Sequence, residues 1–262
     1  MLSYQHAYHA GNLADVHKHA LLAVMLDYLT QKPKPLFYLE THAGRGLYDL
    51  RGAEARKTGE AAQGIRRAEG WFDTAHPYAR ALAAVRTEHG AAAYPGSPLI
   101  AAYLLRDIDT IHLAERHPAE QAALAQVMQP HRVRVYHRDG FELARALTPP
   151  EPRRGLMLID PSYEIASDYT EMPRFIGQIT RKWNVGVIAL WYPVLADARH
   201  EPMLAALDGA HTGALRNEVR FPPVREGHRM TGSGLFVINP PYGLAEAAVQ
   251  LARQFDAGLP VT

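Results

Sequence analysis

The segment Asp160-Pro161-Ser162-Tyr163 follows the apolar run at residues 155–159 and places two hydrogen-bond acceptors next to an aromatic ring. An exocyclic amine on a conjugated ring is a poor nucleophile because its lone pair is delocalised. Acceptors that take both of its N–H bonds favour a pyramidal nitrogen, and the Asp160 carboxylate and the Pro161 carbonyl can do so. With Tyr163 stacked on the base, the segment suits in-line attack on a sulfonium methyl group. The alternative is a strand followed by an ordinary turn.

A second segment, residues 40–46, is rich in glycine and also follows an apolar run. Glycine lets a backbone turn tightly and approach a ligand closely. Its spacing is not the GxGxxG pattern of dinucleotide binding, so it suits a ligand met through an amino-acid moiety rather than through phosphates. The alternative is a strand-to-helix turn that needs glycine for geometry alone.

Two further acidic residues end apolar runs. Glu115 follows residues 111–114, and Asp139-Gly140 follows residues 133–136. A carboxylate at the first position can accept two hydrogen bonds from a ribose diol, and one at the second can accept a bond from an adenine amine. The alternatives are an exposed acidic loop residue and a helix N-cap, which aspartate favours.

These polar residues need a scaffold that gathers them. Short apolar runs are typical of strands buried on both faces of a parallel sheet, and they occur at residues 36–39, 111–114, 133–136, 155–159 and 185–191. Helical patterns fall between them, at residues 119–128, 141–147 and 169–183. The alternation predicts a doubly wound α/β sheet, whose ligands bind at the carboxyl ends of the strands. Residues 214–221 and 234–239 suggest an antiparallel pair at the sheet edge.

One spacing is abnormal for such a sheet. About 70 residues separate Glu40 from Ile111, where a crossover needs roughly 30. The excess lies at residues 51–94 and has helical patterns, so we predict a small helical subdomain inserted into a domain formed by residues 1–50 and 95–262. The alternative is a long surface excursion without a function.

Composition limits the remaining possibilities. The 262 residues include 47% hydrophobic residues, no cysteine and a net charge of +1, so a sizeable core is expected and a thiolate site is excluded. The N-terminus has no signal-peptide pattern and no run reaches the length of a membrane span, so we expect a soluble cytoplasmic protein.

Histidines crowd the N-terminus, at positions 6, 9, 17 and 19. Histidines two apart on a helix point in different directions, and no His-Glu-x-x-His pattern occurs, so no metal site is expected. A polar cap over a cofactor, or RNA contacts made by the N-terminal arm, is the favoured interpretation. Basic residues also cluster at Arg56, Lys57, Arg66 and Arg67, where phosphate contact and solvated surface are the two interpretations.

Taken together, the sequence resembles the bacterial large-subunit rRNA methyltransferase J family, which methylates adenine N6 in 23S rRNA. The most specific matches are His9-Ala10-Gly11-Asn12 and Tyr94-Pro95-Gly96-Ser97-Pro98. The other matches extend over nearly the whole chain, at residues 2–4, 14–16, 18–19, 41–44, 58–60, 99–100, 154–155, 158–161, 189–193 and 238–241.

The resemblance implies a Rossmann-like class I methyltransferase sheet with a helical insertion, S-adenosylmethionine as cofactor, and 23S rRNA as substrate, either protein-free or in an early assembly intermediate. We also expect a monomer without membrane contact. The cofactor contacts carried over are His19, His42, Ser97, Glu115, Asp139, Gly140 and Asp160.

The family's catalytic motif is Asp-Pro-Pro-Tyr, which carries over to Asp160, Pro161 and Tyr163, with Ser162 in place of the second proline. Tyr4 and Lys18 match an N-terminal motif near the active site, and Lys18 is also a candidate RNA contact. Two alternatives to this function are an N-methyltransferase acting on DNA adenine or protein glutamine, and a non-catalytic RNA-binding relative.

Overall fold

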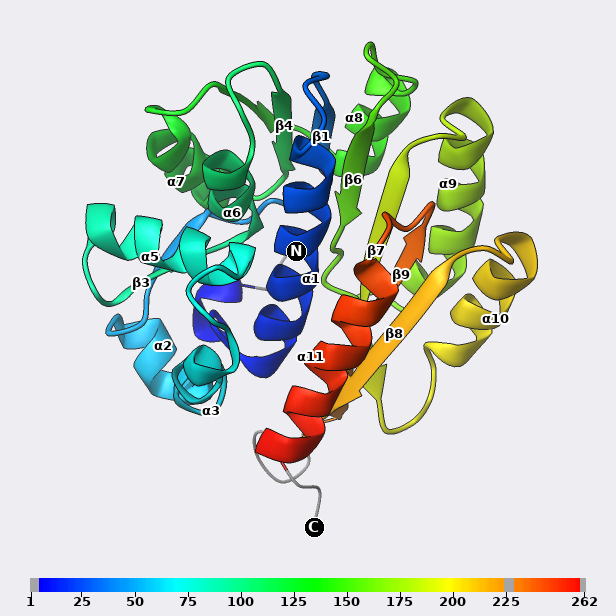
Figure 1. Cartoon of the computed structure of the whole chain (residues 1–262). Helices are drawn as coiled ribbons and strands as arrows, with labels where there is room; N and C mark the ends of the chain where they lie inside the picture. The colour runs from blue at the N-terminus through cyan, green and yellow to red at the C-terminus, as the bar shows by residue number, and fades with distance from the viewer. Residues whose placement is uncertain (1–4, 224–228, 260–262) are drawn as a thin grey trace.

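The computed structural model describes residues 5–223 and 229–259 and contains a seven-stranded sheet (Figure 1). The strand order is β5-β4-β1-β6-β7-β9-β8, in which the first five are parallel and β9 runs antiparallel to both of its neighbours. The strands are β1 (Phe37–Glu40), β4 (Thr110–Glu115), β5 (Val133–His137), β6 (Gly155–Ile159), β7 (Val187–Leu195), β8 (Leu215–Arg220) and β9 (Met230–Ile238). The predicted fold class, a mostly parallel sheet with an antiparallel edge, is confirmed.

Helices cover both faces of this sheet (Figure 1). Residues of α1 (Leu13–Thr30), α6 (Ser97–Leu104), α7 (Pro118–Met128) and α11 (Leu244–Gly258) join one hydrophobic cluster, and residues of α8 (Gly140–Leu147), α9 (Asp168–Lys182) and α10 (Glu201–Ala210) join the other. The central strands β1 and β6 are buried along their whole length because both faces are covered. No described helix is long and apolar enough to cross a bilayer.

Helix α1 is one of four helices outside the insertion, with α6, α10 and α11, that the sequence patterns did not reveal. Most of its 18 residues are buried, including His17, Lys18 and His19. A helix enclosed on nearly all sides lacks the contrast between an apolar and a polar face that makes an amphipathic helix recognisable. Its start is nevertheless encoded locally, since the side chain of Asn12 accepts a hydrogen bond from the Asp15 amide and caps the helix.

The long segment after β1 contains the predicted helices and an unpredicted strand pair. β2 (Leu47–Asp49) pairs antiparallel with β3 (Ala93–Pro95). Between them lie α2 (Ala53–Thr58), α3 (Glu60–Gln63), α4 (Ile65–Ala68), the 3₁₀ turn η2 (Glu69–Trp71) and α5 (Pro77–His89). Buried side chains of this segment, such as Ile65 and Tyr78, join the same hydrophobic cluster as α1.

Close contact between β1 and β6 gives a first prediction. A Cβ atom added at Gly155 would lie 2.0 Å from the Phe37 carbonyl oxygen, so the backbones would have to separate. We expect Gly155→Ala to lower the free energy of unfolding by about 1–3 kcal/mol in urea titrations. The control is Gly209→Ala in α10, where the new methyl group meets nothing within 4 Å. This variant should raise the free energy of unfolding by about 0.5–1 kcal/mol, because alanine favours a helix more than glycine does. Equal stabilities for the two variants would contradict this account of the sheet.

Candidate active site

A cavity of about 900 Å³ lies at the carboxyl ends of the parallel strands. Its volume is within the range of small-molecule sites. It is lined by ten of the residues predicted for the site: Lys18, His19, His42, Ser97, Glu115, Asp139, Gly140, Asp160, Pro161 and Tyr163. The structure therefore brings these predicted residues together, as expected for side chains that follow neighbouring parallel strands. Tyr4, which was also predicted, lies outside the described residues.

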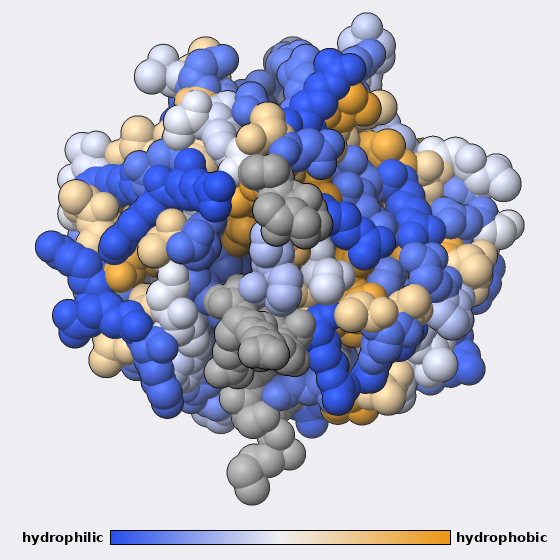
Figure 2. Space-filling model, turned by 90° about the horizontal axis from the view of Figure 1, so that it is seen from below, coloured by the Kyte–Doolittle hydropathy of each residue, from blue (hydrophilic) through white to orange (hydrophobic). Residues whose placement is uncertain are grey.

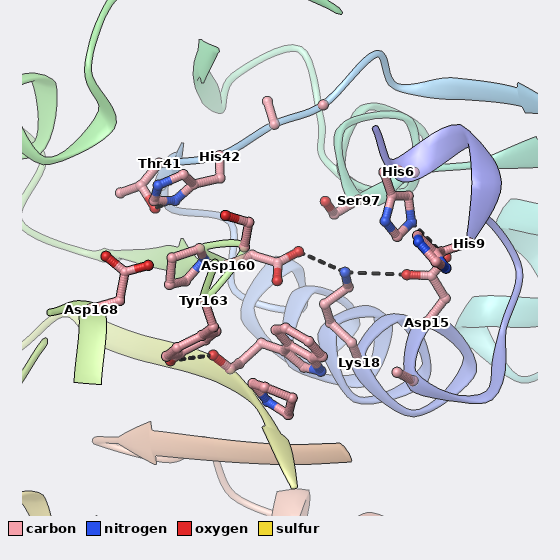
Figure 3. A pocket seen from close by; sticks show the side chains of 18 of the residues that line it. His6, His9, Asp15, Lys18, Thr41, His42, Ser97, Asp160, Tyr163 and Asp168 are labelled. Carbon is pink, nitrogen blue, oxygen red and sulfur yellow. Dashed lines mark hydrogen bonds and ion pairs between the residues drawn. The ribbon is translucent and has the colours of Figure 1, made fainter. Parts of the chain in front are cut away.

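The Asp160 carboxylate forms an ion pair with Lys18 inside the cavity (Figure 3). Lys18 Nζ lies 2.6 Å from Asp160 Oδ2 and 3.2 Å from Asp15 Oδ1, and the lysine is only 5% exposed. Burial alone would lower the Lys18 pKa, but the two carboxylates outweigh it and raise the pKa above its usual value. Lys18 is therefore a buried cation next to the motif carboxylate, and its role as an RNA contact stays a prediction.

Aromatic side chains form the wall next to Asp160. Tyr163 adopts a positive φ of 53°, its hydroxyl donates to the Trp191 carbonyl at 2.9 Å, and its ring centroid lies 4.7 Å from that of Tyr169 (Figure 3). Lys18 Nζ lies 5.4 Å from the centre of the Trp191 ring, within the range of a cation–π contact. These contacts fix the orientation of the Tyr163 ring.

Glu115, at the end of β4, is held by the backbone of two loops. Its Oε2 accepts from the Gly44 amide at 2.9 Å and its Oε1 from the His117 amide at 2.7 Å. A carboxylate has about four acceptor sites, so capacity remains for the hydroxyl groups of a ligand. Glycine at position 44 has a φ of 62°, a conformation that favours this residue type.

Asp139 and Gly140, at the end of β5, fit both interpretations of the sequence. Asp139 Oδ1 accepts from the amides of Phe141 and Glu142, each at 3.0 Å, and so caps α8. The same aspartate also lines the cavity. Gly140 lies so close to β1 that an added Cβ atom would be 1.9 Å from the Thr41 carbonyl oxygen. Its glycine is needed for packing between the strand ends, and no ligand is required to explain it.

A buried carboxyl lies beneath the cavity at Glu40, the last residue of β1. Glu40 accepts from the Tyr38 hydroxyl at 2.5 Å and from the Ser97 hydroxyl at 2.9 Å. Burial raises its pKa to about 8, although both hydrogen bonds lower it. Nearby, His42 Nδ1 is 2.8 Å from the Thr41 hydroxyl, and burial lowers the His42 pKa to about 4. Glu40 is thus mostly protonated and His42 neutral at pH 7.

The N-terminal histidines have separate environments. Burial lowers the pKa of His17 to about 4 and that of His19 to about 3. The His17 ring is hydrogen-bonded to Ser233 and Asn217 and does not line the cavity, so its role is structural. His19 lines the cavity, and its Nδ1 lies 2.9 Å from the Tyr94 hydroxyl.

A group that could hold a metal ion lies elsewhere, at His200, Glu201 and Glu218. The Arg216 guanidinium group already bonds both carboxylates there.

The four predicted phosphate contacts lie outside the cavity, on exposed positions of α2 and α4. Lys57 Nζ lies 5.4 Å from the centre of the Tyr8 ring, and Arg67 donates to the Gly258 carbonyl at 2.5 Å. In the view from below, hydrophilic residues are interspersed with apolar ones on the left, where these helices lie (Figure 2). The structure therefore separates these residues from those of the cavity.

The buried Glu40 carboxyl makes stability depend on pH. A pKa raised from about 4.5 to about 8 in the folded state means that the folded protein holds a proton that the unfolded chain releases. Its contribution is therefore present in full at low pH and is lost as pH rises through 8. In urea titrations from pH 5 to pH 8, we expect the free energy of unfolding of the natural protein to fall by up to about 1.4 kcal/mol per pH unit because of this group. The Glu40→Gln variant should lack this part of the decline. Parallel profiles for the variant and the natural protein would contradict the buried protonated state.

Comparison with known proteins shows the family of this chain. The family model described as "Ribosomal RNA large subunit methyltransferase D, RlmJ" matches residues 33–258. Proteins named Ribosomal RNA large subunit methyltransferase J are 39% identical over 255 residues in Escherichia coli K12 and over 252 residues in Haemophilus influenzae. These alignments cover 94% and 93% of this chain, and 90% and 89% of the relatives.

A crystal structure of a Legionella pneumophila protein superposes with a TM-score of 0.87 at 36% identity, covering 96% of this chain and 94% of the other. Sequence and fold thus match over nearly the whole chain, and the resemblance based on its motifs is confirmed. The chain belongs to the RlmJ family of large-subunit ribosomal RNA methyltransferases.

Proposed function

We propose that this methyltransferase transfers a methyl group from S-adenosylmethionine to the N6 amine of an adenine in 23S rRNA. The observation that carries the proposal is the position of Asp160-Pro161-Ser162-Tyr163 in the same cavity as the acidic ends of β4 and β5. Relatives at 39% identity are named for the large ribosomal subunit, which supports RNA as the substrate.

The polar and aromatic groups that line the cavity suit this cofactor. Glu115, Asp139 and Asp160 offer carboxylate oxygens, and the wall next to them includes His42 and Phe141, whose rings are 5.1 Å apart. Such a set suits hydroxyl groups, amines and a positive charge, and it is unsuited to phosphates. In this proposal Glu115 holds the ribose diol and Asp139 with Gly140 holds the adenine, while His19, His42 and Ser97 lie around the remaining part. S-adenosylmethionine, when bound, supplies a methyl group on a sulfonium centre.

The amine is activated by two oxygen atoms in this proposal. Lys18 occupies Asp160 Oδ2, which leaves Oδ1 and the Pro161 carbonyl as acceptors for the two N–H bonds. The Lys18 ammonium group fixes the orientation of the Asp160 carboxylate, so little reorganisation is needed during the reaction. Methylation would leave a positive charge on the nitrogen, and the methylated amine would lose its proton readily to solvent water. A strong general base is not needed.

Tyr163 supplies the stacking surface for the target base. Its ring is fixed by Tyr169 and by the Trp191 carbonyl, so it is already ordered when a base is extruded from the RNA. Ser162, which replaces the second proline of the family motif, has an exposed side chain. The substitution leaves both proposed acceptors in place, because they belong to the two residues that precede it.

Two alternative functions are less well supported by the motif and by the relatives. An Asp-Pro-x-Tyr motif also suits the amine of a DNA adenine or the amide of a protein glutamine, but the relatives are named for rRNA. A non-catalytic RNA-binding role is favoured only by Ser162, and both acceptors remain.

The decisive assay uses labelled S-adenosylmethionine with protein-free 23S rRNA, duplex DNA and protein, followed by nucleoside analysis. We expect one N6-methyladenine product in the RNA alone. Asp160→Ala should lower the transfer rate by at least about a hundredfold, because the acceptor for the amine is lost, while calorimetry still detects cofactor binding. The control is Asp197→Ala, since Asp197 pairs with Arg199 on the surface.

Each other outcome of this assay has a defined meaning. Full activity of Asp160→Ala would refute the role of this carboxylate. Label found in DNA or protein instead of RNA would select the corresponding alternative. Cofactor binding without transfer to any of the three substrates would favour the non-catalytic relative.

We further propose that residues 51–94 form an inserted subdomain that grips RNA, within a methyltransferase domain of residues 1–50 and 95–262. The exposed positions of Arg56, Lys57, Arg66 and Arg67 support this proposal.

Changing all four of these residues to glutamine should weaken RNA binding and flatten its salt dependence. Each lost phosphate contact lowers the magnitude of the slope of log K against log salt by about 0.7–0.9, so for four contacts we expect this magnitude to fall by about 3 in filter-binding titrations. The matched control removes the same charge from the opposite layer of helices, through glutamine at Arg145, Arg174, Arg181 and Lys182. An equal decrease in both variants would show a general effect of charge and contradict the assignment.

A further inference from the structure

The helices after β2 hold the N-terminal segment against the cavity. The Ile65 amide donates to the Gly11 carbonyl at 2.8 Å, and the Thr58 hydroxyl donates to the Tyr8 carbonyl. Gly64 approaches so closely that an added Cβ atom would lie 2.0 Å from the Gly11 carbonyl oxygen. Residues 8–11 are therefore fixed against the end of α2 and the start of α4, through the Thr58 hydroxyl and the Ile65 amide.

Glu60 of α3 adds side-chain contacts to the same segment. The residue is 6% exposed, and it lines the cavity. Its Oε1 lies 2.8 Å from His9 Nδ1, and its Oε2 accepts from the Asn12 side-chain amide at 3.0 Å. Both oxygens of one buried carboxyl thus contact the segment that leads into α1.

Asn12 connects Glu60 to the start of α1. Its side-chain nitrogen donates to Glu60, and its side-chain oxygen accepts from the Asp15 amide at 2.9 Å. Because one planar amide makes both bonds, a displacement of Glu60 changes the position of the first turn of α1.

Asp15 completes the path to the motif carboxylate. Its Oδ2 accepts from the Gly11 amide at 2.9 Å and is 2.9 Å from His6 Nε2, and its Oδ1 contacts Lys18 Nζ. Lys18 in turn contacts Asp160 (Figure 3). A continuous set of hydrogen bonds and ion pairs therefore runs from α3 through Asn12 to Asp160.

We infer that Glu60 is a positioning residue for methyl transfer, which holds Asn12 and the first turn of α1 so that Lys18 orients the Asp160 carboxylate. This inference rests on the proposed function of Asp160. Packing alone would not require a carboxyl group here, because a buried acid is costly and an apolar residue of similar size fills the same space. What an apolar residue cannot replace is the pair of bonds to His9 and Asn12.

The test compares Glu60→Ala, Glu60→Gln and the control Glu54→Gln in α2. We expect Glu60→Ala to lower kcat at least tenfold, with KM for cofactor and for RNA within threefold of the natural protein. Glu60→Gln should retain kcat within threefold, because an amide can accept from Asn12 and donate to a neutral His9. Glu54→Gln should match the natural protein.

A double-mutant cycle tests whether Glu60 acts through Asn12. If it does, Asn12→Ala combined with Glu60→Ala should be no more than twofold slower than the slower single variant. Should Glu60→Ala fail to fold, Asn12→Ala alone tests the same link, since it leaves the carboxyl and the inserted helices intact.

Hydrogen exchange provides a readout that needs no activity. We expect amides of residues 9–18 to exchange at least tenfold faster in Glu60→Ala and at the natural rate in Glu54→Gln. Unchanged exchange, or a kcat for Glu60→Ala within twofold of the control, would overturn the inference. Equal losses in Glu60→Ala and Glu60→Gln, with weaker RNA and cofactor binding in both, would also overturn it. If the natural protein itself transfers no methyl group to rRNA, the proposed function fails while exchange still reports on positioning.

Discussion

The ion pair between Lys18 and Asp160, with Asp15 on its other side, is the interaction on which the site depends. Three charged groups in a largely buried position are unfavourable unless each is paired, and here one cation lies between two carboxylates. The pairing requires α1 to lie against the carboxyl end of β6. The segment before α1 lines the same cavity at His9 and Asn12, and the Ile65 amide holds it through the Gly11 carbonyl.

The two sides of the cavity are built differently. The side lined by Glu115 and Asp139 is formed by strand ends, and its acceptors are positioned by backbone amides of the following turns. The side near Asp160 is formed by side chains that come from distant segments, with Lys18 142 residues away in the sequence. Backbone geometry thus determines the proposed cofactor contacts, whereas tertiary ion pairs determine the environment of the motif carboxylate.

This difference explains how much the sequence could predict. The seven strands of the main sheet, the helices α7, α8 and α9, the helical character of residues 51–94 and the polar residues at the strand ends follow from local patterns, and the structure contains them. Helix α1 could not be recognised from periodicity, because it is enclosed on nearly all sides. The burial of Lys18 and the raised pKa of Glu40 depend on residues far apart in the sequence, so no local pattern indicates them. For the same reason the β2–β3 pair, whose three-residue strands lie more than 40 residues apart, was not predicted.

The serine at position 162 has a consequence for how such enzymes are defined. Its side chain is exposed, and the atoms proposed to meet the substrate belong to the Asp160 carboxylate, the Pro161 carbonyl and the Tyr163 ring. Ser162 also lines the cavity, but it supplies none of these proposed contact atoms. A search pattern that demands two successive prolines would discard this chain although it retains every proposed contact atom, so membership is better defined by an acid, a carbonyl and a ring at fixed spacing.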